Sequence, residues 1–169
     1  MPEDLLSGQG ELVIHAARYD HPDTVELTQQ VQSFYRSVYG GIDDSPITAQ
    51  DFQPPQGQFL LGYLYGQAVA MGGWRTLSAG LDGAERPVEL KRMFVRPEQQ
   101  GRGFGLQILQ ALERSAAGAG ADWVVLETGR PQVRAVQLYR AAGYREVAPF
   151  GYFACMPLSM HLGRPLDRA

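Results

Sequence analysis

The segment from Glu89 to Glu113 restricts the fold of this chain more than any other part of the sequence. It opens with an apolar, partly alternating run that stops before Pro97, a residue with no N–H for a strand ladder. A loop follows that holds three glycines: Gly101, Gly103 and Gly105. Apolar residues then recur at the spacing of an amphipathic helix: Leu106, Ile108, Leu109, Leu112 and Ala116. The segment therefore predicts a strand, a glycine-rich turn and a helix in direct succession.

A glycine-rich turn at the start of a helix is suited to bind an anion. The first N–H groups of a helix have no partners within it and lie at the positive end of its dipole. Glycines lack the Cβ atoms that would keep a phosphate away, and Arg102 adds a positive charge. A tight turn without a ligand explains the glycines equally well at this point. A P-loop is not indicated because GK[ST] is absent, and the pattern G-x-G-x-x-G has Leu106 in place of its third glycine.

Patterns before this segment predict an antiparallel meander. Strands are expected at 12–17, 59–65, 68–75 and 89–95, with a hairpin turn at Gly66-Gln67. A helix is expected from the turn at 21–24 to the Gly40-Gly41 pair, which ends it.

Patterns after it predict a parallel unit. The central helix is expected to end at Gly118 and Gly120, and Trp123 to Glu127 reads as a strand. A strand–helix–strand succession needs a crossover, so the two strands are expected to be parallel neighbours. A further helix is expected to open at Arg130-Pro131 and to end at Gly143, with the apolar face Val133, Val136, Leu138 and Ala142. Two weaker strands are expected at 144–152 and 156–162, and the ends 1–10 and 164–169 are expected to be loosely held.

Composition excludes several classes of protein. The 169 residues suit one domain spanning 1–169, and no linker or repeat interrupts them. A net charge of −3 argues against a surface that wraps nucleic acid. One cysteine and three widely separated histidines indicate neither a disulfide framework nor a metal site. No apolar run approaches the length of a membrane span, so we expect a cytoplasmic protein.

Two motifs resemble one superfamily. The run Gln100 to Gly105 fits [QR]-x-x-G-x-[GA] and resembles the acetyl-CoA pyrophosphate loop of the GNAT N-acetyltransferases. A second signature of that superfamily, N-x-x-A-x-x-L-Y-x-x-x-G-[FY], resembles 132–144, where Gln132 stands in place of Asn. The matching positions are Ala135, Leu138, Tyr139, Gly143 and Tyr144. LETG at 126–129 and YREVAPFGYF at 144–153 also look like a large bacterial subgroup of small-molecule type.

The resemblance implies a fold and a cofactor. The expected fold is a mixed α/β sheet, with antiparallel N-terminal strands and then a parallel β-α-β unit whose central strands are splayed. Acetyl-CoA is the expected co-substrate, no metal is expected, and the acetyl group passes directly to a primary amine of a small-molecule acceptor. The cofactor-binding positions that the resemblance implies are Met93, Phe94, Val95, Gln100, Gly101, Arg102, Gly103, Phe104, Gly105, Gln132, Ala135 and Tyr139.

Three chemical tasks then need residues. An alkylammonium has a pKa of roughly 10 and must lose a proton before it attacks. Glu89 lies eleven residues before Gln100, as the catalytic glutamate does in some family members, and Glu127 is the second candidate. Glu89 could equally be a strand carboxylate paired with Arg92 or another cation, and a relay through water stays open. A backbone N–H near Met93 or Phe94 would polarise the thioester oxygen.

Tyr139 matches the general-acid tyrosine of the superfamily, which would protonate the departing thiolate. The acceptor contacts that we expect are Tyr35, Tyr39, Asp43 and Tyr152. Asp43, Asp44 and the negative net charge favour a cationic amine. Many relatives pair as homodimers, but nothing in this chain decides its oligomeric state.

Other functions remain open from the sequence. A non-catalytic module that binds or senses acetyl-CoA would carry the same glycine loop, and the acceptor could be a peptide amine. A dinucleotide-binding protein would need the missing third glycine, although Glu127 lies near the distance expected for a ribose ligand. Cys155 as an acyl-enzyme nucleophile has no histidine beside it in the sequence.

Overall fold

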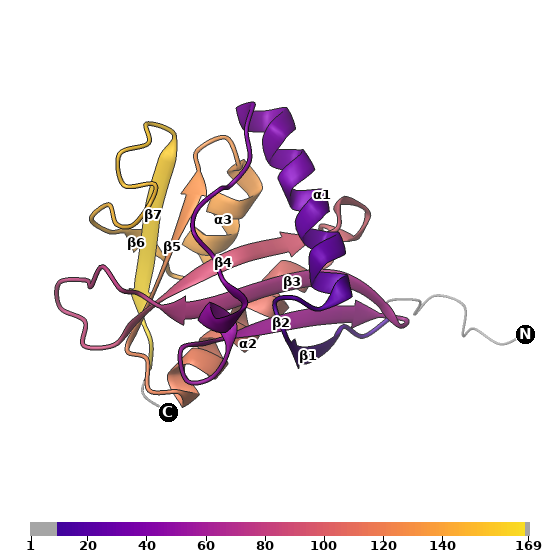
Figure 1. Cartoon of the computed structure of the whole chain (residues 1–169), viewed down its shortest axis with the longest axis horizontal. Helices are drawn as coiled ribbons and strands as arrows, with labels where there is room; N and C mark the ends of the chain where they lie inside the picture. Colours follow the sequence, from indigo (N-terminus) through magenta and orange to yellow (C-terminus); the bar gives the residue numbers. More distant parts are fainter. Residues whose placement is uncertain (1–9, 168–169) are drawn as a thin grey trace, which may run out of the picture.

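A seven-stranded sheet forms the centre of the molecule, in the order β1-β2-β3-β4-β5-β7-β6 (Figure 1). The computed structural model describes residues 10–167, so the predictions for 1–9 and 168–169 lie outside the described residues. The strands are β1 (Val13–Ala17), β2 (Gly57–Leu64), β3 (Gln67–Thr76), β4 (Pro87–Val95), β5 (Trp123–Gly129), β6 (Arg145–Glu146) and β7 (Ser159–Pro165). The first four are antiparallel neighbours and β4 is parallel to β5, as the sequence predicted.

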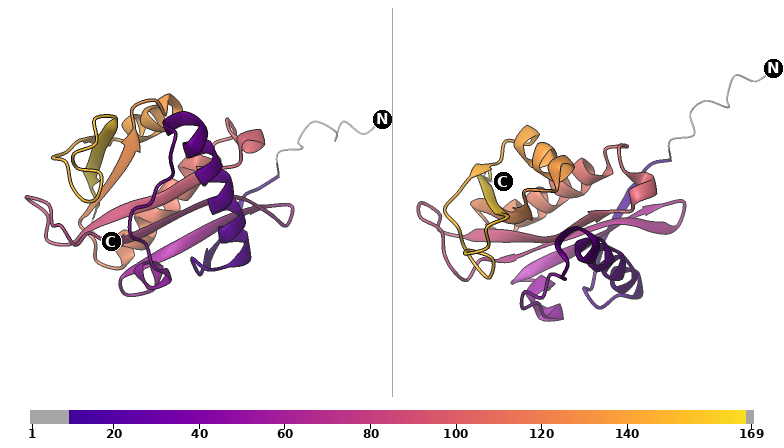
Figure 2. Two further views of the ribbon diagram at one scale, coloured as in Figure 1. Left: turned by 45° about the horizontal axis from the view of Figure 1, so that its top comes forward. Right: turned by 90° about the horizontal axis from the view of Figure 1, so that it is seen from above.

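Helices cover both faces of the sheet (Figure 2). Helix α1 (Pro22–Tyr39) lies on one face together with the 3-10 turn η1 (Ala49–Phe52), and helices α2 (Phe104–Gly118) and α3 (Val133–Ala141) lie on the other. A second 3-10 turn, η2 (Pro97–Gln99), leads from β4 into the glycine loop. The side chain of His21 caps α1 by accepting a hydrogen bond from the Asp23 N–H, and Gly40 ends this helix in the left-handed conformation.

The apolar periodicity of each helix accounts for its position. Helix α2 buries Ile108, Leu109 and Leu112 completely against one face of the sheet, beside Trp74 of β3. Leu27 and Val31 of α1 pack on the opposite face with the aromatic and apolar residues Phe52, Phe59, Leu61 and Met71. Each fully buried side chain of this size contributes roughly 1.5–3 kcal/mol. The sheet is therefore held between two apolar layers and is buried on both faces.

The two central strands diverge. Parallel pairing of β4 with β5 covers only three register pairs, from Pro87 opposite Trp123 to Glu89 opposite Val125. Beyond that point β4 continues to Val95 and β5 to Gly129 without pairing to each other. This confirms the predicted splay, and it leaves the second half of β4 with an open edge.

A bulge in β4 alters the direction of its side chains. Arg92 has a φ of +60°, a value that non-glycine residues seldom adopt, and the register with β3 shifts between Met71 and Gly73. Side chains of a regular strand alternate between its two faces. Here Lys91 and Arg92, which are consecutive, both contact the same carboxylate, Asp43.

Several sequence-based boundaries need correction. The β2–β3 turn is Tyr65-Gly66, both with positive φ, so Gln67 already belongs to β3. Leu106 is exposed because α2 buries Phe104 at its first position instead. Helix α3 begins at Val133, after Pro131, and it buries Tyr139 while Val133 is exposed.

The C-terminal part of the chain also differs from the prediction. The expected strand 144–152 is reduced to the two residues of β6, and the next strand begins at Ser159. Strand β7 extends to Pro165 and pairs along the whole of β5, and Leu166 beyond it is buried. Residues 164–166 are thus part of the packed sheet, and a long loop, 147–158, carries the aromatic residues that were assigned to a strand.

Candidate active site

A cavity of about 470 Å³ opens where β4 and β5 diverge. Its walls come from the open half of β4, the end of β5, the C-terminal end of α1, helix α3 and the loop before β7. The predicted site residues among its lining are Tyr35, Tyr39, Asp43, Met93, Glu127, Gln132, Ala135 and Tyr139. The fold therefore brings together residues that lie more than 100 positions apart in the sequence. We call this space the cleft.

Tyr139 lies in the wall of the cleft that α3 provides. Only 6% of the residue is exposed, and its ring packs against that of Tyr144 with centroids 5.7 Å apart. Burial, followed by the nearby Tyr35 and Glu127, raises the pKa of the Tyr139 hydroxyl. The hydroxyl therefore keeps its proton at neutral pH and can donate it to a stronger base.

Glu127 lies at the end of β5 and faces the cleft. Its Oε1 accepts a hydrogen bond of 2.7 Å from the hydroxyl of Ser159 on β7. Burial raises the pKa of this carboxyl, while the Ser159 hydrogen bond and the ammonium of Lys91 act in the opposite direction. A carboxylate with a raised pKa is a stronger proton acceptor than an exposed one, as a general base requires.

Glu89 is held in an ion pair outside the cleft. Its Oε1 accepts hydrogen bonds from Arg75 Nη2 at 3.0 Å and from Arg75 Nε at 3.2 Å, and the residue is buried. Arg75 also donates to Asp51 Oδ2 at 3.0 Å. The cation beside Glu89 is therefore Arg75 and not Arg92, which binds Asp43.

Asp43 is the centre of a buried charged network. Its Oδ2 lies 2.5 Å from Arg92 Nη1 and 3.3 Å from Lys91 Nζ, and Ser45 donates to its Oδ1 from both N–H and hydroxyl. Against the effect of burial, Lys91 and Arg92 lower the pKa of this carboxyl. Its charge is already balanced by these two cations, so an acceptor ammonium would have to compete with them.

Tyr39 connects α1 to the far side of the cleft. Gln132 Nε2 donates a hydrogen bond of 3.0 Å to the Tyr39 hydroxyl, and the Tyr39 ring lies against Gly129. A Cβ at Gly129 would overlap this hydroxyl and lie 2.6 Å from Cζ. Tyr35 lies one helical turn earlier in α1, and burial, then Asp43, raises the pKa of its hydroxyl.

Two glycines of the loop between β4 and α2 have left-handed backbone conformations. Gly101 and Gly103 have φ of +81° and +82°, and an added Cβ at either would meet no atom within 4 Å. Gly105 packs against Leu138 of α3. The loop is braced by two side chains: Gln100 donates to the Val95 carbonyl at 3.1 Å, and Arg102 donates to Gln99 and lies 4.9 Å from the Phe104 ring. Residues 100–105, Phe94 and Val95 lie outside the lining of the cleft.

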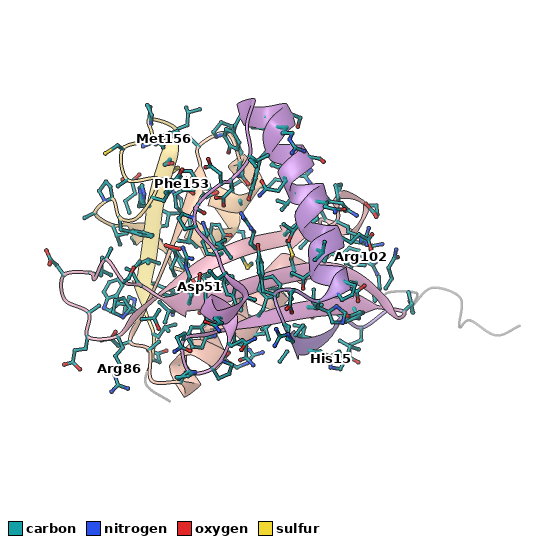
Figure 3. The ribbon with its side chains drawn as sticks, viewed as in Figure 1. His15, Asp51, Arg86, Arg102, Phe153 and Met156 are labelled. Atoms are coloured by element: carbon teal, nitrogen blue, oxygen red, sulfur yellow. The ribbon has the colours of Figure 1, made fainter. Side chains whose placement is uncertain are left out.

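A second cavity of about 420 Å³ adjoins the cleft. The residues common to both linings are Lys91, Glu127 and Phe153. The predicted site residues Glu89 and Tyr152 line the second cavity and not the cleft. Figure 3 labels Phe153 and Met156 on the loop before β7, and Arg102 on the other side of α1 in that view. The predicted acceptor contacts are thus divided between two spaces.

Sequence reasoning missed Lys91, Ser159 and Phe153 as site residues. Lys91 could have been found from the sequence. It is the single lysine of the chain, and it lies on the same predicted strand as the candidate base Glu89. Ser159 and Phe153 gave no such signal, since β7 and the loop before it were placed incorrectly.

Two negative findings apply to the described residues. In 10–167, no group of three or more His, Cys, Asp or Glu side chains is arranged to hold a metal ion. No helix in that range is both long and apolar enough to cross a bilayer. Cys155 is exposed.

Comparison with known proteins finds a matching family and a relative that covers most of this chain. The model of the acetyltransferase (GNAT) family matches residues 25–144. The IAA acetyltransferase of Azospirillum brasilense is 30% identical over 142 residues, which cover 84% of this chain and 90% of that protein.

Two solved structures show the same fold. A Klebsiella pneumoniae structure superposes with a TM-score of 0.76 at 24% identity and covers 92% of this chain and 98% of its own. The yncA protein of Salmonella typhimurium, solved with its cofactor acetyl-CoA, superposes with a TM-score of 0.66 at 18% identity. That comparison covers 94% of this chain and 96% of the Salmonella chain.

Proposed function

This chain is an enzyme of the acetyltransferase (GNAT) family, and from that premise we propose that it transfers an acetyl group from acetyl-CoA directly to a primary amine of a small-molecule acceptor. The observation that carries the proposal is the open edge of β4, which faces Tyr139, Gln132 and Glu127 across the cleft. Acetyl-CoA supplies an activated thioester and a thiolate leaving group.

The open edge of β4 is suited to bind an extended, amide-containing chain. Its backbone groups beyond Glu89 have no partner on β5, and Leu90 to Met93 line the cleft. An extended ligand with amides can add to such an edge as a further strand does. The pantetheine arm has this character, and the Gln132 amide lies on the opposite wall. Gly101 to Gly105 at the N-terminus of α2 would hold the pyrophosphate.

The bulge at Arg92 provides a candidate backbone donor for polarising the thioester oxygen. Arg92 and Met93 have no partner in the register of β3, because the ladder skips from Phe94 to Lys91. A backbone N–H freed in this way is preorganised to stabilise a developing oxyanion, which is worth a few kcal/mol in other acyl-transfer enzymes. We assign this role to the N–H of Met93.

Glu127 and Tyr139 are the proton-transfer groups of the proposal. Glu127 accepts a proton from the acceptor ammonium, and the amine then forms the new N–C bond as the C–S bond breaks. Tyr139 donates its proton to the departing sulfur. The nitrogen loses a second proton as the amide forms, and this proton returns the Tyr139 hydroxyl to its protonated form through solvent, while Glu127 releases the first proton to solvent. We prefer Glu127 to Glu89 as the base because Glu127 lines the cleft, whereas Glu89 is paired with Arg75.

Calorimetric titration with acetyl-CoA tests the proposal, with NAD as the control ligand. We expect micromolar binding of acetyl-CoA and none of NAD. Gly103→Glu should weaken binding by about 100-fold or more, because the new carboxylate opposes the phosphates and about two charge-assisted hydrogen bonds are lost.

Gly83→Glu is the matched control for backbone strain and charge. Gly83 has a φ of +84°, meets no atom within 4 Å of an added Cβ, and lies on the β3–β4 loop, outside both cavity linings. This variant should bind acetyl-CoA as the wild type does. No binding by the wild type, or equal effects of the two substitutions, would contradict the proposal.

A further inference from the structure

We propose that the acceptor occupies the second cavity and is a primary amine on a neutral apolar or aromatic body, without a carboxylate next to the amine. This inference rests on the proposed function and adds to it the chemical class of the acceptor. Of the acceptor contacts expected from the sequence, it keeps Tyr152 and moves the acceptor away from Tyr35, Tyr39 and Asp43. We call the second cavity the acceptor pocket.

The position of the acceptor pocket is the first argument. It meets the cleft at Lys91, Glu127 and Phe153. Glu127 is therefore accessible from both spaces, which is what the proton acceptor between an amine and a thioester requires. The volume of about 420 Å³ lies within the range of roughly 300–1,000 Å³ typical of small-ligand sites.

The apolar walls are the second argument. Leu77 and Phe150 line the acceptor pocket and are buried against Val125. Tyr152 and Phe153 also line it, and their rings pack edge to face with centroids 5.0 Å apart. Aromatic walls of this kind bind an apolar or aromatic body.

The balance of charge is the third argument. Within residues 10–167, Arg75 and Lys91 are the cations that line the acceptor pocket, and both are already paired with carboxylates. Arg75 binds Glu89 and Asp51 at 3.0 Å each.

Lys91 is likewise already paired with a carboxylate. Its Nζ lies 3.3 Å from Asp43 Oδ2 and 3.0 Å from the Ser45 hydroxyl, and it faces the Phe153 ring at 5.6 Å. The side chain is only 9% exposed. Neither cation of the acceptor pocket is therefore left to pair with an anionic substrate.

Glu127 differs from the other carboxylates of the acceptor pocket, because its hydrogen-bond partner is the neutral hydroxyl of Ser159. An ammonium placed beside Glu127 would have the carboxylate as an oppositely charged partner. A carboxylate brought in with that amine would be buried without a cation, which is costly. The pocket therefore selects amines over the corresponding amino acids.

Three commercial compounds test this selection: 2-phenylethylamine, phenylalaninamide and phenylalanine. They share the aromatic ring, and the amide and the acid are nearly isosteric, so the last two differ chiefly in the charge of one group. Release of free CoA thiol is measured with saturating acetyl-CoA, and kcat/KM is compared per unprotonated amine. We expect kcat/KM for phenylalanine to be about tenfold or more below that for the two amines without a carboxylate.

A pair of substitutions tests whether the acceptor binds in the acceptor pocket or in the cleft. Ala79 is exposed and lines only the acceptor pocket, whereas Ile42 is exposed and lines only the cleft. Ala79→Trp should raise KM for 2-phenylethylamine about tenfold and leave the Kd of acetyl-CoA unchanged. If Ile42→Trp raises this KM and Ala79→Trp does not, the acceptor lies in the cleft and the inference is wrong.

The remaining outcomes separate this inference from the proposed function. Acetyl-CoA binding by the wild type with no turnover of either amine that lacks a carboxylate, or with phenylalanine preferred, overturns the acceptor class and leaves the cofactor assignment intact. Failure of the wild type to bind acetyl-CoA overturns both.

Discussion

At the scale of single residues, burial and a hydrogen bond act in opposite directions on the protonation of Glu127. Burial favours the neutral acid, whereas the hydrogen bond from Ser159 favours the carboxylate. A general base works only in its deprotonated form, so activity falls as the pH drops through its pKa. Ser159 should therefore set the lower limit of the pH range in which the enzyme works.

Ser159→Ala tests this control. Without the hydroxyl, the pKa of Glu127 rises further, and the acidic limb of kcat/KM should move to higher pH. The pH–rate profile measures the shift, and Glu127→Gln, which cannot titrate, should lose the limb. An unmoved limb in Ser159→Ala would exclude Glu127 as the group that titrates there.

Tyr139 poses a separate question at the same scale, because its hydroxyl is held in a buried position with a raised pKa. Tyr139→Phe keeps the ring and its packing on Tyr144 but removes the proton donor. We expect kcat to fall by about 100-fold while the calorimetric Kd of acetyl-CoA stays within about twofold. An unchanged kcat would remove Tyr139 from the acid role.

At the scale of secondary-structure elements, the end of α1 and the β5–α3 loop depend on each other. The Tyr39 ring fits against Gly129 only because no Cβ is present there. The Tyr39 hydroxyl accepts a hydrogen bond from the Gln132 side-chain amide. Gly129 has no left-handed φ, so alanine fits its backbone. The substitution would act by moving a side chain, with little strain in the strand.

Gly129→Ala should displace Tyr39, release Gln132 and raise KM for acetyl-CoA about threefold to tenfold, at a stability cost of about 1 kcal/mol. The effect is measured alone and in combination with Tyr39→Ala. Because Tyr39→Ala already removes the ring, adding Gly129→Ala to it should have little further effect. Fully additive losses would show that the two residues act independently.

At the scale of the whole molecule, the parts predicted correctly are those encoded within short stretches of sequence. The strand, turn and helix from Glu89 to Gly118 appear where apolar spacing and glycines placed them. The parallel pairing of β4 and β5 followed from the need for a crossover. Family motifs marked Gln132 and Tyr139 as cofactor-binding residues; both line the cleft, and their roles stay predictions.

The parts that were missed depend on contacts between distant segments. The pairing of Asp43 with Lys91 and Arg92 spans 48 and 49 positions and requires a bulge that no local pattern indicates. Residues 147–158 have apolar residues that predicted strands, but pairing with β7 stops after Arg145 and Glu146, and Phe150, Tyr152 and Phe153 line the acceptor pocket instead. Tertiary packing therefore overrode local preference in this part of the chain.

The environment of Lys91 bears on how an enzyme of this kind tolerates its own reagent. Acetyl thioesters react with neutral amines, and exposed lysines of a protein that concentrates acetyl-CoA are the nearest targets. This chain has a single lysine. Its nitrogen lies 3.3 Å from Asp43 Oδ2, and the side chain is only 9% exposed. The protein therefore presents no exposed ε-amine on its surface, and chemical self-acetylation of lysine has no ready site.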